Sequence, residues 1–158
     1  MTDFAIRFAR EDDLAPINAL RKQVNDLHVS GKPEIFRPGF CGEMRDHLYG
    51  IRGDPAWRIV TAEADGAVRG YAVLHHIRRP ENRVMRERDY LEIDEFGVDE
   101  AFRRRGIASE MIAFIRAFAK EEGFSRIELN VWEFNRDALA FYEAVGFTTY
   151  RRYMETDV

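Results

Sequence analysis

The chain contains 158 residues, of which 46% are hydrophobic and 33% are charged, and its formal net charge is −4. This length suits one domain, and the aromatic content argues against a disordered chain. No apolar run approaches the roughly 20 residues of a membrane-spanning helix, and no signal peptide is legible. The acidic balance argues against nucleic acid or membrane partners, and the single cysteine, Cys41, favours a reducing compartment. We therefore expect a cytoplasmic enzyme or binding domain.

Hydropathy patterns in the first half of the chain predict strands and helices of ordinary length. Alternating apolar residues favour strands, and apolar residues spaced three or four positions apart favour helices. Glycine and proline mark the ends of these segments. The expected elements are a strand over 4–8, a helix over 14–31, a loop over 31–42, a weaker helix around 44–48, and strands over 57–64 and 68–77 joined by an Asp65-Gly66 turn.

The arginine-rich segment 78–89 is expected to be a solvated loop, with an anion- or substrate-contacting loop as the alternative. The next strand, over 90–98, loses its alternation at Asp94-Glu95. One extra residue in a strand has this effect, and such β-bulges often lie beside active sites. A strand that is buried on both faces is the alternative, because it need not alternate.

The second half of the chain predicts two more helices and two more strands. They are a helix over 106–122, a strand over 127–131, a helix that Asn135 opens and Gly146 closes, and a strand over 147–154. The strand–helix–strand unit over 90–132 should be parallel. The fold class is therefore mixed α/β.

The segment 98–108 joins a strand to a helix and carries three consecutive arginines, Arg103–Arg105. The first turn of a helix offers free backbone N–H groups and a partial positive charge, which together bind phosphate. Gly106 lets an anion approach the backbone without obstruction by a Cβ atom. The spacings GxGxxG and GxxxxGK[ST] of general nucleotide-binding motifs are absent.

Two patterns in this half of the chain resemble the GNAT superfamily, the acyl-CoA-dependent N-acyltransferases. The segment Arg103-x-x-Gly106-x-Ala108 resembles the pyrophosphate-binding turn of that family. The residues that resemble its C-terminal signature are Asn135, Ala138, Tyr142, Gly146 and Phe147. The close match covers roughly residues 90–150, and the earlier elements fit the family's topology loosely.

The resemblance implies a single domain over 1–158, with an acceptor-side half over 1–89 and an acetyl-CoA-binding core over 90–150. It implies a twisted, mixed but mostly antiparallel sheet of about six or seven strands, flanked by about four helices. The strands would splay apart at the acetyl-CoA site. The implied activity is direct transfer of an acetyl group from acetyl-CoA to a primary amine, without a metal.

Carried over residue by residue, the resemblance assigns acetyl-CoA contacts to a strand, a turn and a helix. They are Phe96, Gly97, Val98, Arg103, Arg104, Arg105, Gly106, Ile107, Ala108, Asn135 and Tyr142. The turn would bind the pyrophosphate through its backbone, and the strand would pair with the pantetheine arm. The amide of Val98 is the candidate donor to the thioester oxygen. Asn135 has a second interpretation as a helix N-cap.

Tyr142 matches the family's general-acid tyrosine, which protonates the leaving thiolate, with a half-buried packing role as the alternative. An amine with a pKa near 10.4 is protonated at pH 7, and neutralising it costs about 4–5 kcal/mol, so a base would help. The candidate bases are Glu92, Asp94 and Glu95, of which we favour Glu92 and Glu95. For each, a solvent-facing or salt-bridged carboxylate is the alternative.

The acceptor remains open at this stage. The carboxylates on the strand favour a cationic amine, whereas the arginines of 78–88 favour an acidic one, and residues 28–40 would cover the acceptor site. We expect a small-molecule amine, with a protein N-terminus or lysine as one alternative and an inactive acyl-CoA-binding module as another. The adjacent His75 and His76 should face opposite sides of a strand, so we expect no metal site. Relatives often form homodimers, but no interface signature is visible.

Overall fold

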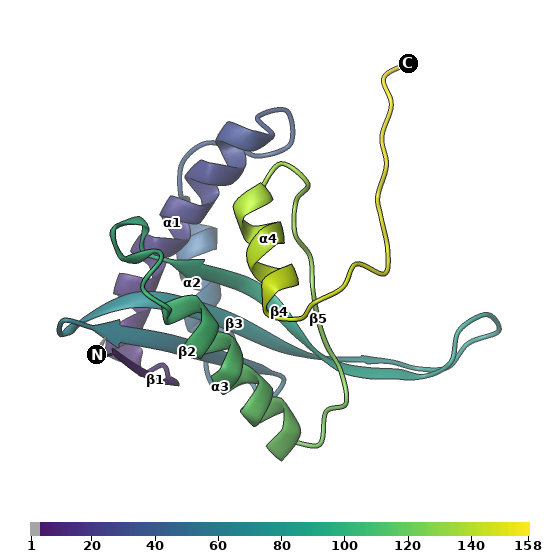
Figure 1. Ribbon diagram of the computed structural model, residues 1–158, viewed down its shortest axis with the longest axis horizontal. Helices are drawn as coiled ribbons and strands as arrows, with labels where there is room; N and C mark the ends of the chain where they lie inside the picture. Colours follow the sequence, from purple (N-terminus) through teal and green to yellow (C-terminus); the bar gives the residue numbers. More distant parts are fainter. Residues whose placement is uncertain (1–3) are drawn as a thin grey trace.

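The computed structural model describes residues 4–158 and shows one sheet with helices on both faces (Figure 1). Its elements are β1 (Phe4–Phe8), η1 (Glu11–Asp13), α1 (Leu14–Gly31), α2 (Gly42–Ile51), β2 (Trp57–Ala64), β3 (Ala67–Arg79), β4 (Arg88–Val98), η2 (Glu100–Phe102), α3 (Ile107–Glu121), β5 (Ile127–Leu129) and α4 (Arg136–Ala144). Most of these bounds agree with the sequence predictions to within a few residues. The arginine-rich loop is shorter than predicted, because β3 and β4 extend into it as a projecting hairpin.

The five strands follow one another in chain order across the sheet. Neighbours are antiparallel except for β4 and β5, which are parallel as predicted for the strand–helix–strand unit. That parallel pairing joins Leu91–Ile93 only to Ile127–Leu129. Beyond Ile93, β4 continues to Val98 without β5 beside it, so the sheet opens between these two strands (Figure 1).

The predicted final strand over 147–154 is wrong, and the sheet in residues 4–158 has five strands rather than six or seven. Residues 147–158 carry no regular secondary structure and extend away from the body of the molecule (Figure 1). Alternation of residue types shows that a segment suits a strand, but a strand forms only where a neighbouring backbone supplies its hydrogen bonds.

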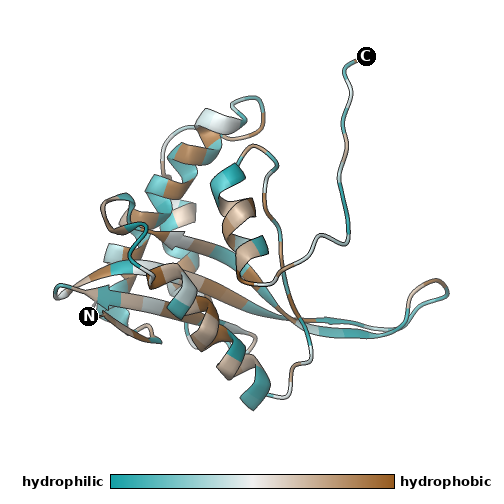
Figure 2. Cartoon of the chain, viewed as in Figure 1, coloured by the Kyte–Doolittle hydropathy of each residue, from teal (hydrophilic) through white to brown (hydrophobic). Residues whose placement is uncertain are grey.

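The sheet buries apolar residues on both faces. Figure 2 shows hydrophobic residues, in brown, along the strands and along α3. On one face Leu74 and Ile93 pack with Met111 of α3. On the other face Val73 packs with Ile17 of α1, alongside residues of α2. The strand β4 therefore lies between two helical layers. None of the helices in residues 4–158 combines the length and apolar character that would be needed to cross a bilayer.

Candidate active site

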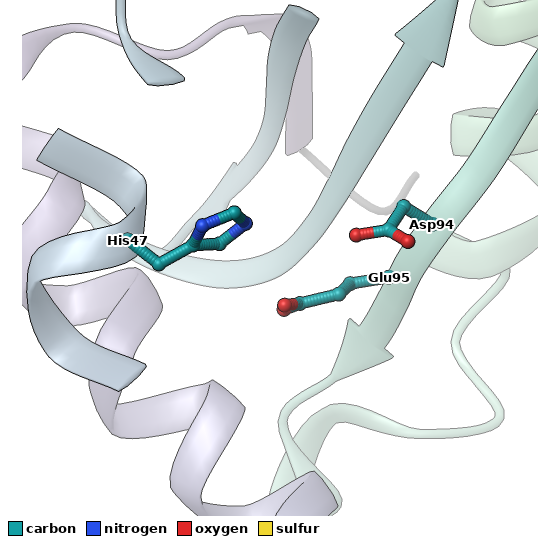
Figure 3. Close-up of side chains that lie close together, drawn as sticks. All are labelled: His47, Asp94 and Glu95. Atoms are coloured by element: carbon teal, nitrogen blue, oxygen red, sulfur yellow. The ribbon is translucent and has the colours of Figure 1, made fainter. Parts of the chain in front are cut away.

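A β-bulge in β4 shapes the centre of the molecule. Val73 pairs with Glu95 while the next residue of β3, Leu74, pairs with Ile93, so Asp94 is the extra residue. This register confirms the predicted bulge. The bulge turns Asp94 and Glu95 towards the same helix, where His47 of α2 faces both carboxylates (Figure 3). The nearest nitrogen and oxygen atoms of these three side chains all lie within 4.8 Å of one another.

Glu95 is held by a guanidinium on both carboxylate oxygens. Arg21 of α1 donates from Nε at 2.6 Å and from Nη2 at 2.7 Å. The remaining Nη1 donates to Asn18 Oδ1 at 2.9 Å and to the carbonyl of Met44. The Arg21 side chain is only 7% exposed. This bidentate pair holds α1 and the start of α2 against the bulge, and it engages both carboxylate oxygens of Glu95.

Asp94 and Glu92 differ from Glu95 because no side chain among residues 4–158 donates a hydrogen bond to either. Burial, and next the charge of Glu95, raise the pKa of Asp94 above its usual value. Burial, and next the charge of Asp94, raise the pKa of Glu92 in the same way. These two carboxylates therefore bind a proton more readily than ordinary surface carboxylates do.

A row of side chains lies across the strands beside these carboxylates. Register places Trp57 of β2 opposite His75 of β3, and His75 opposite Glu92 of β4, so all three share one face of the sheet. The Trp57 and His75 rings stack with centroids 3.7 Å apart, and the His47 ring meets Trp57 edge-on at 5.7 Å. His76 instead contacts Phe124 on the other face, which confirms that the adjacent histidines diverge.

His47, Asp94 and Glu95 are also the side chains that the described residues bring together in a metal-ligating set. Imidazole and carboxylates suit several divalent ions. However, the Arg21 guanidinium already occupies both oxygens of Glu95, and its positive charge lies where it would repel a cation. The arrangement therefore favours acid–base chemistry over metal binding at this position.

The segment 28–40 packs across the opening between β4 and β5. The His28 ring stacks on Phe36 with centroids 4.8 Å apart, and Phe36 meets Trp132, which follows β5, at 5.0 Å. The Phe40 ring lies 5.4 Å from the Arg21 guanidinium, on the bulge side. Burial lowers the pKa of His28 below its usual value. These contacts gather aromatic rings of the segment 28–40 against Trp132 and against Arg21, the partner of Glu95.

The predicted phosphate-binding turn forms the N-terminus of α3. Gly106 has a φ of 87° and Arg104 a φ of 66°, so two residues of this turn adopt left-handed backbone. The helical hydrogen bonds begin with the amide of Glu110, which donates to the carbonyl of Gly106. The three preceding amides, of Ile107, Ala108 and Ser109, are thus left for an external acceptor. A Cβ atom built on Gly106 would meet nothing within 4 Å, so this turn faces open space.

The arginines of the turn have different contacts. Arg103 Nε donates to the carbonyl of Val98 at 3.4 Å, which ties the turn to the end of β4. Arg105 lies 3.8 Å from Asp65 and stacks on Phe102. Arg104 is exposed and carries the strained backbone. Residues with such strain are concentrated at ligand-binding sites, which agrees with the predicted role of this turn.

The opening between β4 and β5 is bordered by α4, which carries Tyr142. The Tyr142 ring meets Phe96 of β4 at 6.1 Å and Phe147 at 5.7 Å. Burial raises the pKa of Tyr142 to about 12, so the phenol stays protonated at neutral pH. Asn135 Oδ1 accepts a hydrogen bond from the amide of Ala138 at 3.2 Å, which confirms its N-cap role. The amide nitrogen of its side chain remains available for a ligand.

Gly97 has a packing role in addition to its predicted contact with the pantetheine arm. A Cβ atom at this position would lie 2.7 Å from Tyr71 Cε1 and 2.9 Å from Val24 Cγ2. The glycine therefore lets α1 and the buried Tyr71 approach β4 closely. Its side-chain position faces α1, so only its backbone is available to the opening beside β5.

The sequence gives little or no indication that several residues belong to this site. Arg21 lies on the apolar stripe of α1, four positions after Ile17, where a charged residue needs a buried partner. That position could have identified it. The sequence offers Asp94 as a candidate base but favours Glu92 and Glu95 over it. His47 and Trp57 reach the site only because α2 and β2 pack there, and no local pattern predicts this.

Comparisons with known proteins agree with this architecture. The profile of the acetyltransferase (GNAT) family matches residues 21–147, and the chain belongs to this family. N-acetyltransferase 8 of Homo sapiens is 29% identical over 110 residues, which cover 68% of this chain and 45% of that protein. An uncharacterized N-acetyltransferase of Lactobacillus delbrueckii subsp. lactis is 28% identical over 109 residues, 69% of this chain and 62% of that protein. The matches thus span less than two thirds of these relatives.

Solved structures share the fold over nearly the whole chain. A mutant of the BH1408 protein from Bacillus halodurans has a TM-score of 0.92 at 26% identity, covering 98% of this chain and 99% of that one. The aminoglycoside N-acetyltransferase AAC(6')-Iy in complex with CoA has a TM-score of 0.78 at 19% identity, covering 100% of this chain and 96% of that one. The second likeness concerns the fold alone.

Proposed function

We propose that this protein transfers an acetyl group from acetyl-CoA directly to the primary amine of a small molecule. One observation carries the proposal: the open N-terminal turn of α3 follows directly after the part of β4 that β5 does not pair with. Tyr142 contacts Phe96 in this part of β4, and Asp94 lies at the bulge just before it. A phosphate at the turn, an extended arm along β4 and a reacting thioester near the bulge would fit this order. The single cysteine, Cys41, is free, which suits the reducing cytoplasm.

The residues that would hold acetyl-CoA are those of the turn and the strand before it. The amides of Ile107 and Ala108 would bind the pyrophosphate, with positive charge from Arg103–Arg105 nearby. The backbone of Phe96–Val98 would pair with the pantetheine arm, because β5 does not accompany this stretch. The amide of Val98 would stabilise the oxygen of the thioester as negative charge develops on it.

An acceptor that binds in its charged form loses two protons from its nitrogen, one before the attack and one after it, of which one reaches the thiolate and the other passes to solvent. The amine nitrogen attacks the thioester carbonyl carbon, the C–N bond forms, and the C–S bond breaks. Asp94 would accept the proton from the amine, because its carboxylate is not engaged by Arg21. Tyr142 would donate a proton or a hydrogen bond to the sulfur, since burial keeps its phenol protonated.

A small-molecule acceptor is supported by the charge beside the bulge and by the aromatic rings of the segment 28–40. Asp94 and Glu92 carry charge that no cation of the described residues neutralises by a hydrogen bond, which suits a positively charged amine. The segment 28–40 stacks His28 on Phe36 and Phe36 against Trp132, and such a cover over the acceptor side suits a compact molecule. Among the proteins of similar fold, AAC(6')-Iy was solved with a bisubstrate analog of an aminoglycoside.

Two measurements test the proposal. Calorimetric titration of acetyl-CoA should show saturable binding at one site per chain, and thiol release should then appear with some member of a panel of primary amines. If a peptide with a free N-terminus supports thiol release and small amines do not, the acceptor is a protein rather than a small molecule. Absence of acetyl-CoA binding would contradict the proposal altogether.

A further inference from the structure

An open pocket lies at the base of the projecting hairpin that β3 and β4 form (Figure 1). The strand β2 begins at Trp57, opposite His75, so the end of β3 has no strand of residues 4–158 on that side. The pocket is lined by Pro55, Ala56 and the last five residues of β3, His75–Arg79. It therefore joins the row of Trp57, His75 and Glu92 to the arginines of the hairpin.

One face of the sheet connects the two ends of this pocket. Alternation along β3 places His75, Ile77 and Arg79 on the same face, and the register places Glu92 of β4 opposite His75 on that face. Arg79 follows His75 by four residues, which is about 13 Å along a strand. The face thus runs from the carboxylates at the bulge, past the apolar side chain of Ile77, to a guanidinium at the base of the hairpin.

Arg79 differs from the neighbouring arginines because no carboxylate of residues 4–158 forms an ion pair with it. Arg78 lies 3.5 Å from Asp89. Arg88, which is opposite Arg79 in the register, forms an ion pair with Glu128. The Arg79 side chain is exposed at the pocket, so its guanidinium is free to bind an anion from solution.

A single acceptor that carries both charges would satisfy both ends of this face. Asp94 and Glu92 accept no hydrogen bond from a cation of residues 4–158, and Arg79 has no carboxylate partner there. A guanidinium holds a carboxylate by two parallel hydrogen bonds, which gives geometric specificity as well as affinity. In the sequence, the carboxylates of β4 and the arginines of the hairpin favour opposite kinds of acceptor. Their placement on one face removes this conflict.

We propose that Arg79 binds a carboxylate of the acceptor, so that the acceptor is a primary amine with a carboxylate at its other end. This inference rests on the proposed function, because the amine end would react beside Asp94. The chain between the two charged groups would lie along β3, over Ile77 and His75. A linear ω-amino acid or a short peptide has this arrangement of charges.

The first test compares amines that differ only in the distal charge. The probes are the ω-amino acids from 4-aminobutanoate to 8-aminooctanoate, each paired with its own carboxamide. In thiol-release assays with acetyl-CoA, the best carboxylate should have a KM about tenfold below that of its amide, because a hydrogen bond to a charged group contributes at least this much. Arg79→Gln should remove this preference through KM rather than kcat, and Arg79→Lys should restore part of it. Arg83→Gln, at an exposed arginine of the hairpin loop, is the matched control and should keep the preference.

The second test measures binding without catalysis. Trp57 stacks on His75 beside the pocket, and Trp132→Phe leaves it as the single tryptophan of the chain. Titration of this variant with 6-aminohexanoate should change the tryptophan fluorescence, and the amide should require about tenfold higher concentrations for the same change. Addition of Arg79→Gln should make the two titrations alike.

The two tests separate this inference from the proposed function. If no probe supports thiol release but 6-aminohexanoate binds through Arg79, the inference stands and the activity needs revision. If the amines are acetylated but the carboxylates bind no more tightly than their amides, the inference is overturned and the proposed function stands. A preference for the carboxylates that survives Arg79→Gln also overturns the inference.

Discussion

Asp94 and Glu95 are adjacent in the chain and face the same helix, yet they contact different groups. Arg21 holds both oxygens of Glu95. Asp94 faces His47 (Figure 3), and its carboxylate accepts no hydrogen bond from a side chain of residues 4–158. We therefore propose different roles for these two neighbouring carboxylates. Asp94 suits proton transfer, and Glu95 suits the support of the bulge.

Replacing Asp94 with asparagine should lower the turnover of an amine substrate by about 100-fold, because a general base contributes at least this much. Burial raises the pKa of Asp94, so ionising it costs folding free energy above the pKa that it has in the unfolded chain. The Asp94→Asn variant should therefore gain stability at pH 7, and this gain should shrink as the pH falls through the raised pKa of Asp94 and vanish below the pKa of the unfolded chain. Rate assays check the loss of turnover, and urea titrations at pH 7 and at a pH below the pKa of the unfolded chain check the change in stability. Asp46→Asn, at an exposed aspartate of α2, is the control.

Replacing Tyr142 with phenylalanine should also lower turnover by about 100-fold, because the hydroxyl acts on the leaving thiolate. The affinity for acetyl-CoA should change little, since the ring still packs on Phe96 and Phe147. Calorimetry and single-turnover kinetics separate the two effects. Unchanged turnover under conditions where the chemical step limits the rate would exclude Tyr142 as the acid.

At the scale of elements, the Arg21–Glu95 pair joins α1 to the bulge of β4. Glu95→Gln should lower the free energy of unfolding by about 2–3 kcal/mol, because it leaves the nearly buried guanidinium without its counter-charge. The double variant Arg21→Met, Glu95→Leu should lose less than the sum of its two single changes. Denaturant titrations measure this coupling, and strict additivity would show that the clamp contributes nothing.

The helix α3 has a glycine at each end, Gly106 before it and Gly123 after it, and these two residues form a matched pair for testing the turn before α3. Gly106 and Gly123 both have positive φ, and a Cβ atom at either would meet nothing within 4 Å. Replacement of either by valine should cost about 1–2 kcal/mol of stability through backbone strain. Only Gly106→Val should weaken acetyl-CoA binding, by about tenfold or more. Equal affinities in the two variants would contradict the assignment of this turn to the pyrophosphate.

At the scale of the whole molecule, bound acetyl-CoA should stabilise the fold, because it would contact elements that share few contacts with one another. Its proposed site touches the turn before α3, the edge of β4 and the cap of α4, on both sides of the opening in the sheet. At a concentration 100 times its dissociation constant, a ligand of this kind adds about 2.7 kcal/mol to the free energy of unfolding. Thermal unfolding with and without acetyl-CoA measures this gain, and AMP at the same concentration serves as control.

The sequence by itself determined most of the elements, the bulge and the family, but not the absence of a strand over 147–154. Alternation and helical spacing are local properties of the chain, and the extra residue at Asp94 breaks a local pattern, so each could be predicted without knowledge of the packing. The turn Arg103–Ala108 is likewise a contiguous motif. The N-cap role of Asn135 follows from its neighbours in the chain and was confirmed.

Only the tertiary structure decided which carboxylate is free and where the last segment goes. Arg21 and Glu95 are 74 residues apart in sequence, and their pairing depends on how α1 packs against β4. His47 and Trp57 reach the site through the same long-range packing. The segment 147–154 has the composition of a strand, but a strand needs a neighbouring edge, and the structure shows that this chain does not place the segment along its own.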